Sequence, residues 1–92
     1  MVKINSKFDL GRVVITRGAE AELSEEDVDS GIRRHAMGDW GDVVEDDAKM
    51  NDEALKHEGR IMSVYHSEDG VKFWIITEWD RSATTILLPS EY

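Results

Sequence analysis

One short run in the middle of the chain contains the side-chain types that acid–base chemistry uses. The run His35–Val43 reads HAMGDWGDV and places an imidazole close to a carboxylate. A histidine held by an aspartate can act as a general base, and a charged histidine is stabilised at the C-terminal end of a helix. The pattern therefore allows a minimal hydrolase or small-ligand site with His35 as base, Asp39 as its orienting group and Arg81 as an anion clamp.

The same run also fits a purely structural role. His35 and Asp39 would then bond each other or the turn backbone, while Trp40 anchors the turn in the core. The glycines at positions 38 and 41 favour this interpretation, because glycine adopts backbone angles that other residues resist.

A second candidate region is the polar corner Thr77–Ser82, TEWDRS, which is followed by two threonines. It combines an acid, a base and hydroxyl groups where two strands are expected to meet. Glu78, Asp80 and Arg81 could form a binding epitope, or an ion-pair network that fixes the corner. Threonines pair favourably across strands whatever the function, so both interpretations stay open.

The usual signatures of metal and cofactor sites are missing. The chain has no cysteine, and its three histidines lack the short spacing of a zinc site. The acidic run 42–53 does not match a calcium loop, since Val44 stands where the third position needs oxygen and no glycine occupies the sixth. The glycines of the run HAMGDWGDV lack the lysine of a phosphate loop, and no nucleophile elbow is present. We therefore predict no metal, no cofactor and no recognisable enzyme signature.

Charge is the strongest compositional feature. The 92 residues carry a net charge of −9, and residues 19–53 hold thirteen Asp and Glu against three Lys and Arg. Such a chain is not expected to bind nucleic acid directly, because that needs clustered cations. A protein partner with a basic surface is predicted instead, although an acidic surface can also be merely solvated. The candidate binding residues are Glu25, Glu26, Asp29, Asp46, Asp47, Trp40, Glu78, Asp80 and Arg81.

Size and hydropathy limit the possibilities further. A chain of 92 residues predicts one domain over residues 1–92. It has no apolar leader and no run of membrane-spanning length, so a cytoplasmic protein without membrane contact is expected. Either a monomer or a small homo-oligomer fits this length.

The elements that position these residues can be predicted from periodicity and capping. A first strand is expected at Arg12–Arg17, where β-branched residues follow a glycine. Helical segments are expected at Ala19–Glu25, at Ser30–Met37 with Asp29 as N-cap, and at Val44–Lys56. Ser24 and Asp27 resemble a weak capping box, and Gly38 suits a left-handed helix end.

Three further strands are expected in the C-terminal third. Arg60–His66 alternates in polarity, SEDG is a hairpin turn, and Val71–Trp79 and Thr84–Leu88 follow. Because Val71–Trp79 is apolar on both sides, it should be central. The predicted fold is α+β: a small antiparallel sheet of about four strands, formed by a three-strand C-terminal meander plus an N-terminal strand, with short helices on one face.

The chain resembles a family of small bacterial proteins often carried on plasmids and other mobile elements. Members share an "RH..GDWG" motif and a C-terminal "WIITE.DRS.TTILLP.EY" motif, and the likeness covers most of the chain. The matching residues are Arg34, His35, Gly38, Asp39, Trp40, Gly41, Asn51, Ser63, Tyr65, Trp74–Glu78, Asp80–Ser82, Thr84–Pro89, Glu91 and Tyr92.

The resemblance and the charge together favour a small acidic accessory protein of mobile-element type that acts by binding another protein. In its sharper form, this hypothesis has the acidic surface mimic nucleic acid and inhibit a host defence system, either restriction or CRISPR. The alternatives are the minimal hydrolase or ligand-binding domain described above, and an oligomerising domain that uses the strands within Val71–Leu88 as its interface.

Overall fold

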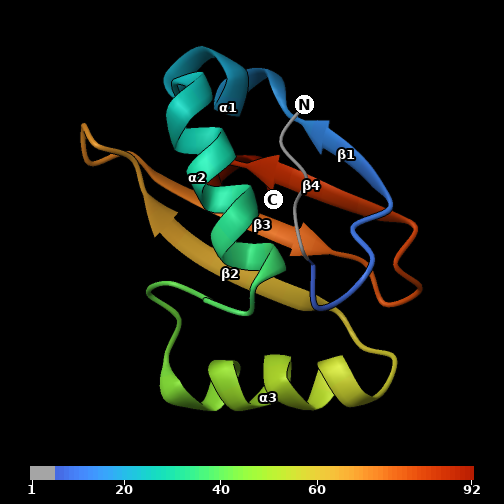
Figure 1. Ribbon diagram of the computed structural model, residues 1–92. Coiled ribbons are helices and arrows are strands. Elements are labelled where there is room, and N and C mark those ends of the chain that lie inside the picture. The colour runs from blue at the N-terminus through green and yellow to red at the C-terminus, as the bar shows by residue number, and fades with distance from the viewer. Residues whose placement is uncertain (1–5) are drawn as a thin grey trace.

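The computed structural model describes residues 6–92 and contains three helices and a four-strand sheet (Figure 1). The α+β class is therefore confirmed. In chain order the elements are β1 (Arg12–Ile15), α1 (Arg17–Glu22), α2 (Glu25–Ala36), α3 (Glu45–Lys56), β2 (Ile61–His66), β3 (Lys72–Thr77), β4 (Ala83–Leu87) and a 3₁₀ turn (Pro89–Glu91).

The strand order in the sheet is β1-β4-β3-β2. The C-terminal meander is confirmed, and β3 lies between β2 and β4 as its two apolar faces predicted. The first strand differs from expectation, because β1 pairs parallel to β4 and makes the sheet mixed rather than antiparallel. The three helices, β2 and β3 separate β1 from β4 in sequence, so no hairpin dictates their relative direction.

The second helix begins earlier than predicted. It starts at Glu25 with Ser24 as N-cap, whose Oγ accepts a hydrogen bond from the Asp27 amide at 3.1 Å. The predicted start at Ser30, with Asp29 as N-cap, was wrong because Ser24 caps the helix earlier and the acidic residues after it suit a first helical turn. Gly31 itself is required by packing, since a Cβ there would lie 2.9 Å from the Phe73 ring.

The main core lies between the sheet and the first two helices. Figure 1 shows α1 and α2 across one face, whereas α3 lies beside the β2 edge, so the predicted single covering layer holds for two of the three helices. A second cluster under α3 contains Trp40, Ala54 and Ile61, with Phe8 packed against it. The residues buried in the main core are Ala19, Leu23, Tyr65, Phe73, Ile75 and Ile86.

The outer edge of β2 is covered by two separate devices. The Asn51 side chain bonds both backbone groups of Met62, donating to its carbonyl at 2.8 Å and accepting from its amide at 3.1 Å. Further along, Val64 donates to the Trp40 carbonyl at 3.0 Å and accepts from the Asp42 amide at 2.8 Å. The glycine-rich turn therefore forms an isolated parallel β-bridge between Gly41 and Val64, which protects an edge that would otherwise invite pairing.

The C-terminal residues bind back to the start of α1. The Glu91 carboxylate accepts hydrogen bonds from the Thr16 hydroxyl at 2.6 Å and from the Gly18 amide at 3.0 Å. The first of these bonds keeps the pKa of Glu91 below its usual range. No helix within residues 6–92 has the length and apolar character needed to cross a membrane.

Candidate functional site

His35, the candidate base, is fully buried at the interface of α2 and the sheet. Its Nδ1 lies 2.6 Å from the Ser63 Oγ, and its Nε2 lies 2.8 Å from the Thr77 Oγ1. The chain of polar contacts continues from Thr77 to the Thr84 Oγ1 at 2.7 Å, and Thr84 donates to the Leu10 carbonyl at 2.6 Å. Four buried polar side chains are thus joined in one line that runs from β2 through α2 and β3 to β4.

The direction of every proton in this line follows from its last member. A carbonyl can only accept, so the Thr84 hydroxyl donates its hydrogen to the Leu10 carbonyl and must accept a hydrogen bond from Thr77. The Thr77 hydroxyl then accepts from His35, which places the imidazole proton on Nε2. Nδ1 is left as an acceptor for the Ser63 hydroxyl. The network fixes one neutral tautomer of His35 and satisfies both ring nitrogens.

This environment opposes the charged imidazolium form. Burial lowers the pKa of His35 from 6.5 to about 3, because the charged form loses its hydration. The ring packs edge-on against Phe8 and Trp40, with centroid distances of 5.3 and 5.9 Å. A base needs a free nitrogen within reach of its substrate, so this geometry favours the structural interpretation of His35.

Asp39 does not orient His35. Its carboxylate accepts two hydrogen bonds from Arg34, at 2.8 and 3.3 Å, and one from the Gly41 amide at 3.2 Å. The bond to Arg34 keeps the pKa of Asp39 below its usual value. The Asp39 carbonyl also accepts from the Tyr65 hydroxyl at 2.6 Å. The expected bond to the turn backbone is therefore present, and Trp40 is buried as the structural interpretation required.

Arg81, the candidate anion clamp, binds carbonyl groups. Its guanidinium donates to the Ala54 carbonyl at 2.6 Å and to the carbonyls of Gly59 and Glu78. Arg81 thereby satisfies the C-terminal end of α3, where a positive charge is favoured, and joins it to the β3–β4 corner. Its backbone takes the left-handed conformation, with φ 60°. Arg81 therefore fixes the corner through backbone carbonyls rather than through the acids expected from sequence.

We predict that Arg81→Lys lowers the free energy of unfolding by about 2–3 kcal/mol, because a single ammonium group cannot serve carbonyls of α3 and of the corner together. Urea unfolding followed by circular dichroism would measure the loss. Arg33→Lys is the matched control, since Arg33 is exposed and should tolerate the change. Equal stability of the two variants would show that the Arg81 contacts do not hold α3 to the corner.

The other two corner candidates have separate partners. Glu78 pairs with Arg60 at 3.5 Å, and Asp80 accepts from the Ser82 amide at 3.0 Å. Bonding from the Ser82 hydroxyl and amide keeps the pKa of Asp80 below its usual range. Glu78 and Asp80 therefore stabilise the corner separately, and the predicted network with Arg81 is not formed.

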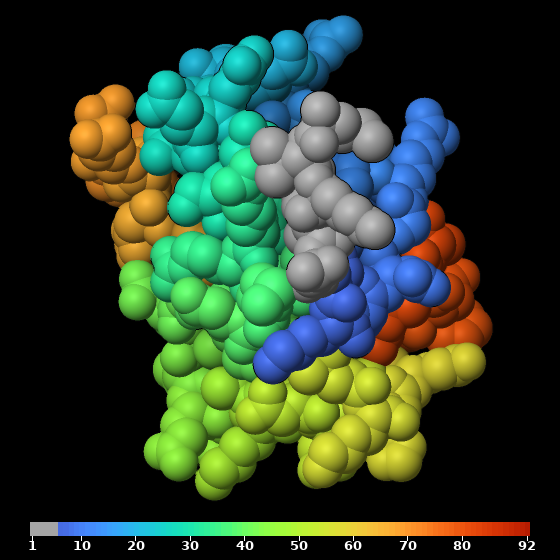
Figure 2. Space-filling model, in the orientation of Figure 1, coloured from blue at the N-terminus to red at the C-terminus, as the bar shows by residue number. Residues whose placement is uncertain are grey.

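The acidic residues predicted as one binding surface fall into two groups. Figure 2 shows α1 and α2 at one end of the viewed face and α3 at the other. Glu25, Glu26 and Asp29 lie on α2, whereas Asp46 and Asp47 lie on α3. Sequence proximity could not reveal this separation, because the turn after α2 carries the chain around the β2 edge.

A pocket of about 340 Å³ lies between β1, α1 and α2. Apolar side chains and carboxylates line it in equal number, and no cation is among them. Within residues 6–92, none of these carboxylates forms an ion pair. We call this feature the α1–α2 pocket; its lining residues are Ile15, Glu20, Leu23, Glu25, Val28 and Asp29.

Glu25 and Asp29 were predicted from sequence as binding residues, but Glu20 and the apolar members of the α1–α2 pocket were missed. Leu23 and Val28 look like ordinary core positions in the sequence. The sequence does carry one signal for this pocket. At the α1–α2 connection, Leu23 and Val28 each have acidic residues next to them in the chain.

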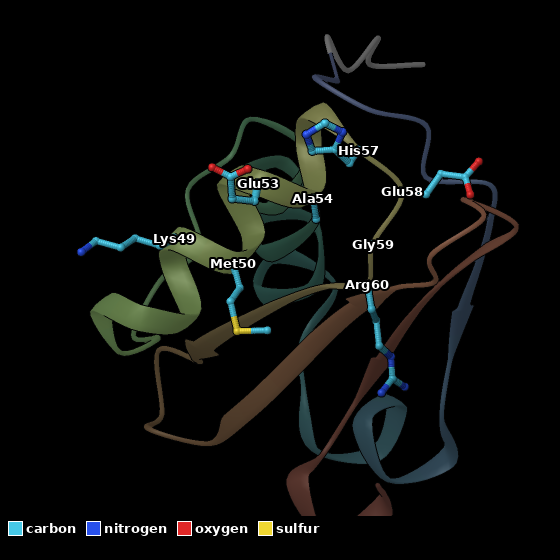
Figure 3. A pocket seen from close by; sticks show the side chains of 8 residues that line it. All are labelled: Lys49, Met50, Glu53, Ala54, His57, Glu58, Gly59 and Arg60. Carbon is cyan, nitrogen blue, oxygen red and sulfur yellow. The ribbon is translucent and has the colours of Figure 1, made fainter.

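A larger groove of about 470 Å³ follows the C-terminal half of α3 and the loop to β2 (Figure 3). Met50 from α3 and Arg60, the residue before β2, point to the same side in this view. Its lining mixes Lys49 and Arg60 with Glu53 and Glu58, so the charges largely offset one another. The adjoining 220 Å³ hollow contains Asp47, again with Arg60. Neither hollow has the single sign of charge found in the α1–α2 pocket.

Within the described part of the chain, no group of three or more His, Asp or Glu side chains is placed to hold a metal ion. Comparison of the chain with protein-family models, with curated proteins and with solved structures finds no match.

Proposed function

We propose that this protein acts by binding another protein, and that it does so through the carboxylates around the α1–α2 pocket. The observation that supports this most directly is that the pocket combines three buried or half-buried apolar side chains with three exposed carboxylates, none of which is paired with a cation of residues 6–92. An acidic surface that is only hydrated does not need apolar side chains beside its carboxylates.

The pocket suits a long basic side chain. Lys and Arg have an apolar stem and a charged head, and the two parts prefer different surroundings. Here the stem can lie on Ile15, Leu23 and Val28 while the head reaches the carboxylates of Glu20, Glu25 and Asp29. Arginine fits best, because its planar fork binds carboxylates in pairs. The surrounding negative charge would also speed the encounter with a basic partner.

The partner we propose is a nucleic-acid-binding protein of a host defence system, either restriction or CRISPR, in keeping with the mobile-element resemblance. The longest dimension of the molecule is 34 Å, over which duplex DNA carries about 20 phosphate charges. The net charge of −9 is less than half of that, and the acidic residues of α2 and of α3 lie on helices at opposite ends of the face in Figure 2. These values support occupation of a short basic patch rather than imitation of a whole helical turn.

Neutralising the pocket tests the proposal. We expect the triple variant Glu20→Gln, Glu25→Gln and Asp29→Asn to weaken partner binding about tenfold or more, because charge pairs at an interface are strongly coupled. The partner would be captured from bacterial lysate with the tagged wild-type protein at low and high salt, and its affinity would then be measured by calorimetry.

A second triple variant on α3 provides the matched control: Glu45→Gln, Asp46→Asn and Asp47→Asn. It removes the same charge from the other end of the molecule, so binding should change by less than about threefold if contacts rather than net charge matter. If both triple variants lost the same affinity for the partner, net charge alone would explain the binding. Binding that neither salt nor the pocket variant weakens would refute the proposal.

A further inference from the structure

The two edge strands of the sheet, β1 and β2, differ in how their outer backbone groups are covered. The β2 edge is covered by the Asn51 side chain and by the Trp40–Asp42 segment, as described above. The β1 edge has no such cover from residues 6–92, because β4 lies on its only paired side. Natural proteins usually protect both edges of a sheet, so the open β1 edge requires an explanation.

The backbone groups that β1 leaves free can be identified from its pairing. The Arg12 amide donates to the Ser82 carbonyl and the Thr16 amide to the Ile86 carbonyl, both at 3.0 Å. In a parallel ladder alternate residues face the same neighbour, so Val14 also faces β4. The amides and carbonyls of Val13 and Ile15 point away from the sheet, and residues 6–92 supply no partner for them.

The side chains of β1 also suit a partner strand. Val13 and Val14 are 47% and 39% exposed, which makes them two of the exposed large hydrophobic residues of the molecule. Ile15 belongs to both features, because its backbone lies on the open edge while its side chain lines the α1–α2 pocket. The open edge and the acidic pocket are therefore contiguous.

We infer that the partner binds as an extended basic segment that adds a strand to the β1 edge and inserts a Lys or Arg side chain into the α1–α2 pocket. This inference rests on the proposed function and specifies the mode of binding. In strand addition the backbone bonds supply affinity and alternate side chains supply specificity. Directly opposed residues on neighbouring strands have Cβ atoms about 5 Å apart, so a basic residue opposite Ile15 lies within reach of the pocket carboxylates.

Charge complementarity makes a second copy of this chain a poor occupant. Each copy carries a net charge of −9, and two β1 edges pairing with each other would bring two acidic pockets to the same junction. Like charges at such short range oppose association. A basic partner segment meets the same edge with the opposite sign.

The test uses the full 92-residue chain and, as probe, a terminally blocked peptide of alternating valine and arginine. Val13→Pro removes one outward amide without touching the β1–β4 ladder, and proline is tolerated at that kind of edge position. Val13→Ala is the matched control, because it removes the side chain and keeps the amide. We expect Val13→Pro to bind the peptide about tenfold more weakly than Val13→Ala, the effect of losing one interface hydrogen bond and its neighbouring contacts.

Hydrogen exchange followed by NMR provides a readout that requires no substitution. Saturating peptide should slow the exchange of the Val13 and Ile15 amides, whereas the Arg12 and Val14 amides, already bonded to β4, should change little. Equal affinities of the two Val13 variants, unchanged exchange at Val13 and Ile15, or no binding of the peptide at millimolar concentration would each overturn strand addition. The proposed function would still stand if lysate capture remained sensitive to the pocket charges, so the two failures are distinguishable.

Discussion

Replacing Gly41 by alanine is expected to lower the free energy of unfolding by more than about 4 kcal/mol, one of the largest effects a single methyl group can have. A Cβ at this position would lie 2.0 Å from the Val64 carbonyl oxygen and 2.7 Å from the Tyr65 ring, and the residue has φ 72°. The chain would have to leave β2, which breaks the bridge between Gly41 and Val64. Urea unfolding monitored by circular dichroism, with sedimentation to detect aggregation, measures both consequences.

Gly70→Ala is the matched control, because it tests the cost of the left-handed backbone conformation without a close contact to another strand. Gly70 has φ 85°, yet no atom lies within 4 Å of a Cβ built on it. Its substitution should therefore cost only the left-handed conformation, about 1 kcal/mol. If the two alanine variants were equally stable, the close approach of the Gly41 backbone to β2 would not be a requirement of the fold.

The difference between the two glycines gives the GDWG segment a physical role. Trp40 fixes the turn in the core, Gly41 allows contact with Val64, and Asp39 joins the turn to Arg34. A run that looks like a site in sequence thus serves mainly to close the β2 edge. Asp39 and Asp42 bond to Arg34, Gly41 and His66 within the molecule, whereas residues 6–92 leave the opposite edge of the sheet, at β1, without a paired strand.

Periodicity predicted the elements well wherever a local signal decided them. The strands β2, β3 and β4, the helix α3 and the left-handed Gly38 follow from alternation, capping and turn chemistry that neighbouring residues supply. The direction of β1 depends on a distant partner, β4, and no nearby residue encodes that contact. The start of α2 was misplaced for a different reason, because its local cap at Ser24 was given too little weight.

The sequence predicted some of the residues of the candidate site but not which of them lie together in the fold. Asp and Glu on α2 could be proposed as binding residues from charge alone, and Glu25 and Asp29 do line the α1–α2 pocket. The pairing of Asp39 with Arg34 rather than with His35 could not be read from spacing, because both partners lie within reach in sequence. Likewise, only the fold shows that Asp46 and Asp47 on α3 lie apart from the acidic residues of α2.

The buried His35 should make the protein sensitive to acid in a range where carboxylates still contribute little. Its pKa falls from 6.5 to about 3 on folding, so the unfolded chain binds one more proton than the native state between these values. Stability from this residue is complete above pH 6.5 and is lost as the pH falls towards 3, on the order of 5 kcal/mol in total. Between pH 6 and 5 the expected loss is about 1 kcal/mol, measurable by urea unfolding at fixed ionic strength.

NMR of the imidazole nitrogens identifies the source of that loss. The hydrogen-bond line from Ser63 to Leu10 requires the neutral ring with its proton on Nε2, and this form should persist unchanged from pH 8 to pH 5. The exposed His57 is the control, since His57→Gln removes a histidine without touching the network and should leave the loss between pH 6 and 5 in place. A native His35 that gains its proton near pH 6.5 would contradict the network and restore His35 as a candidate base.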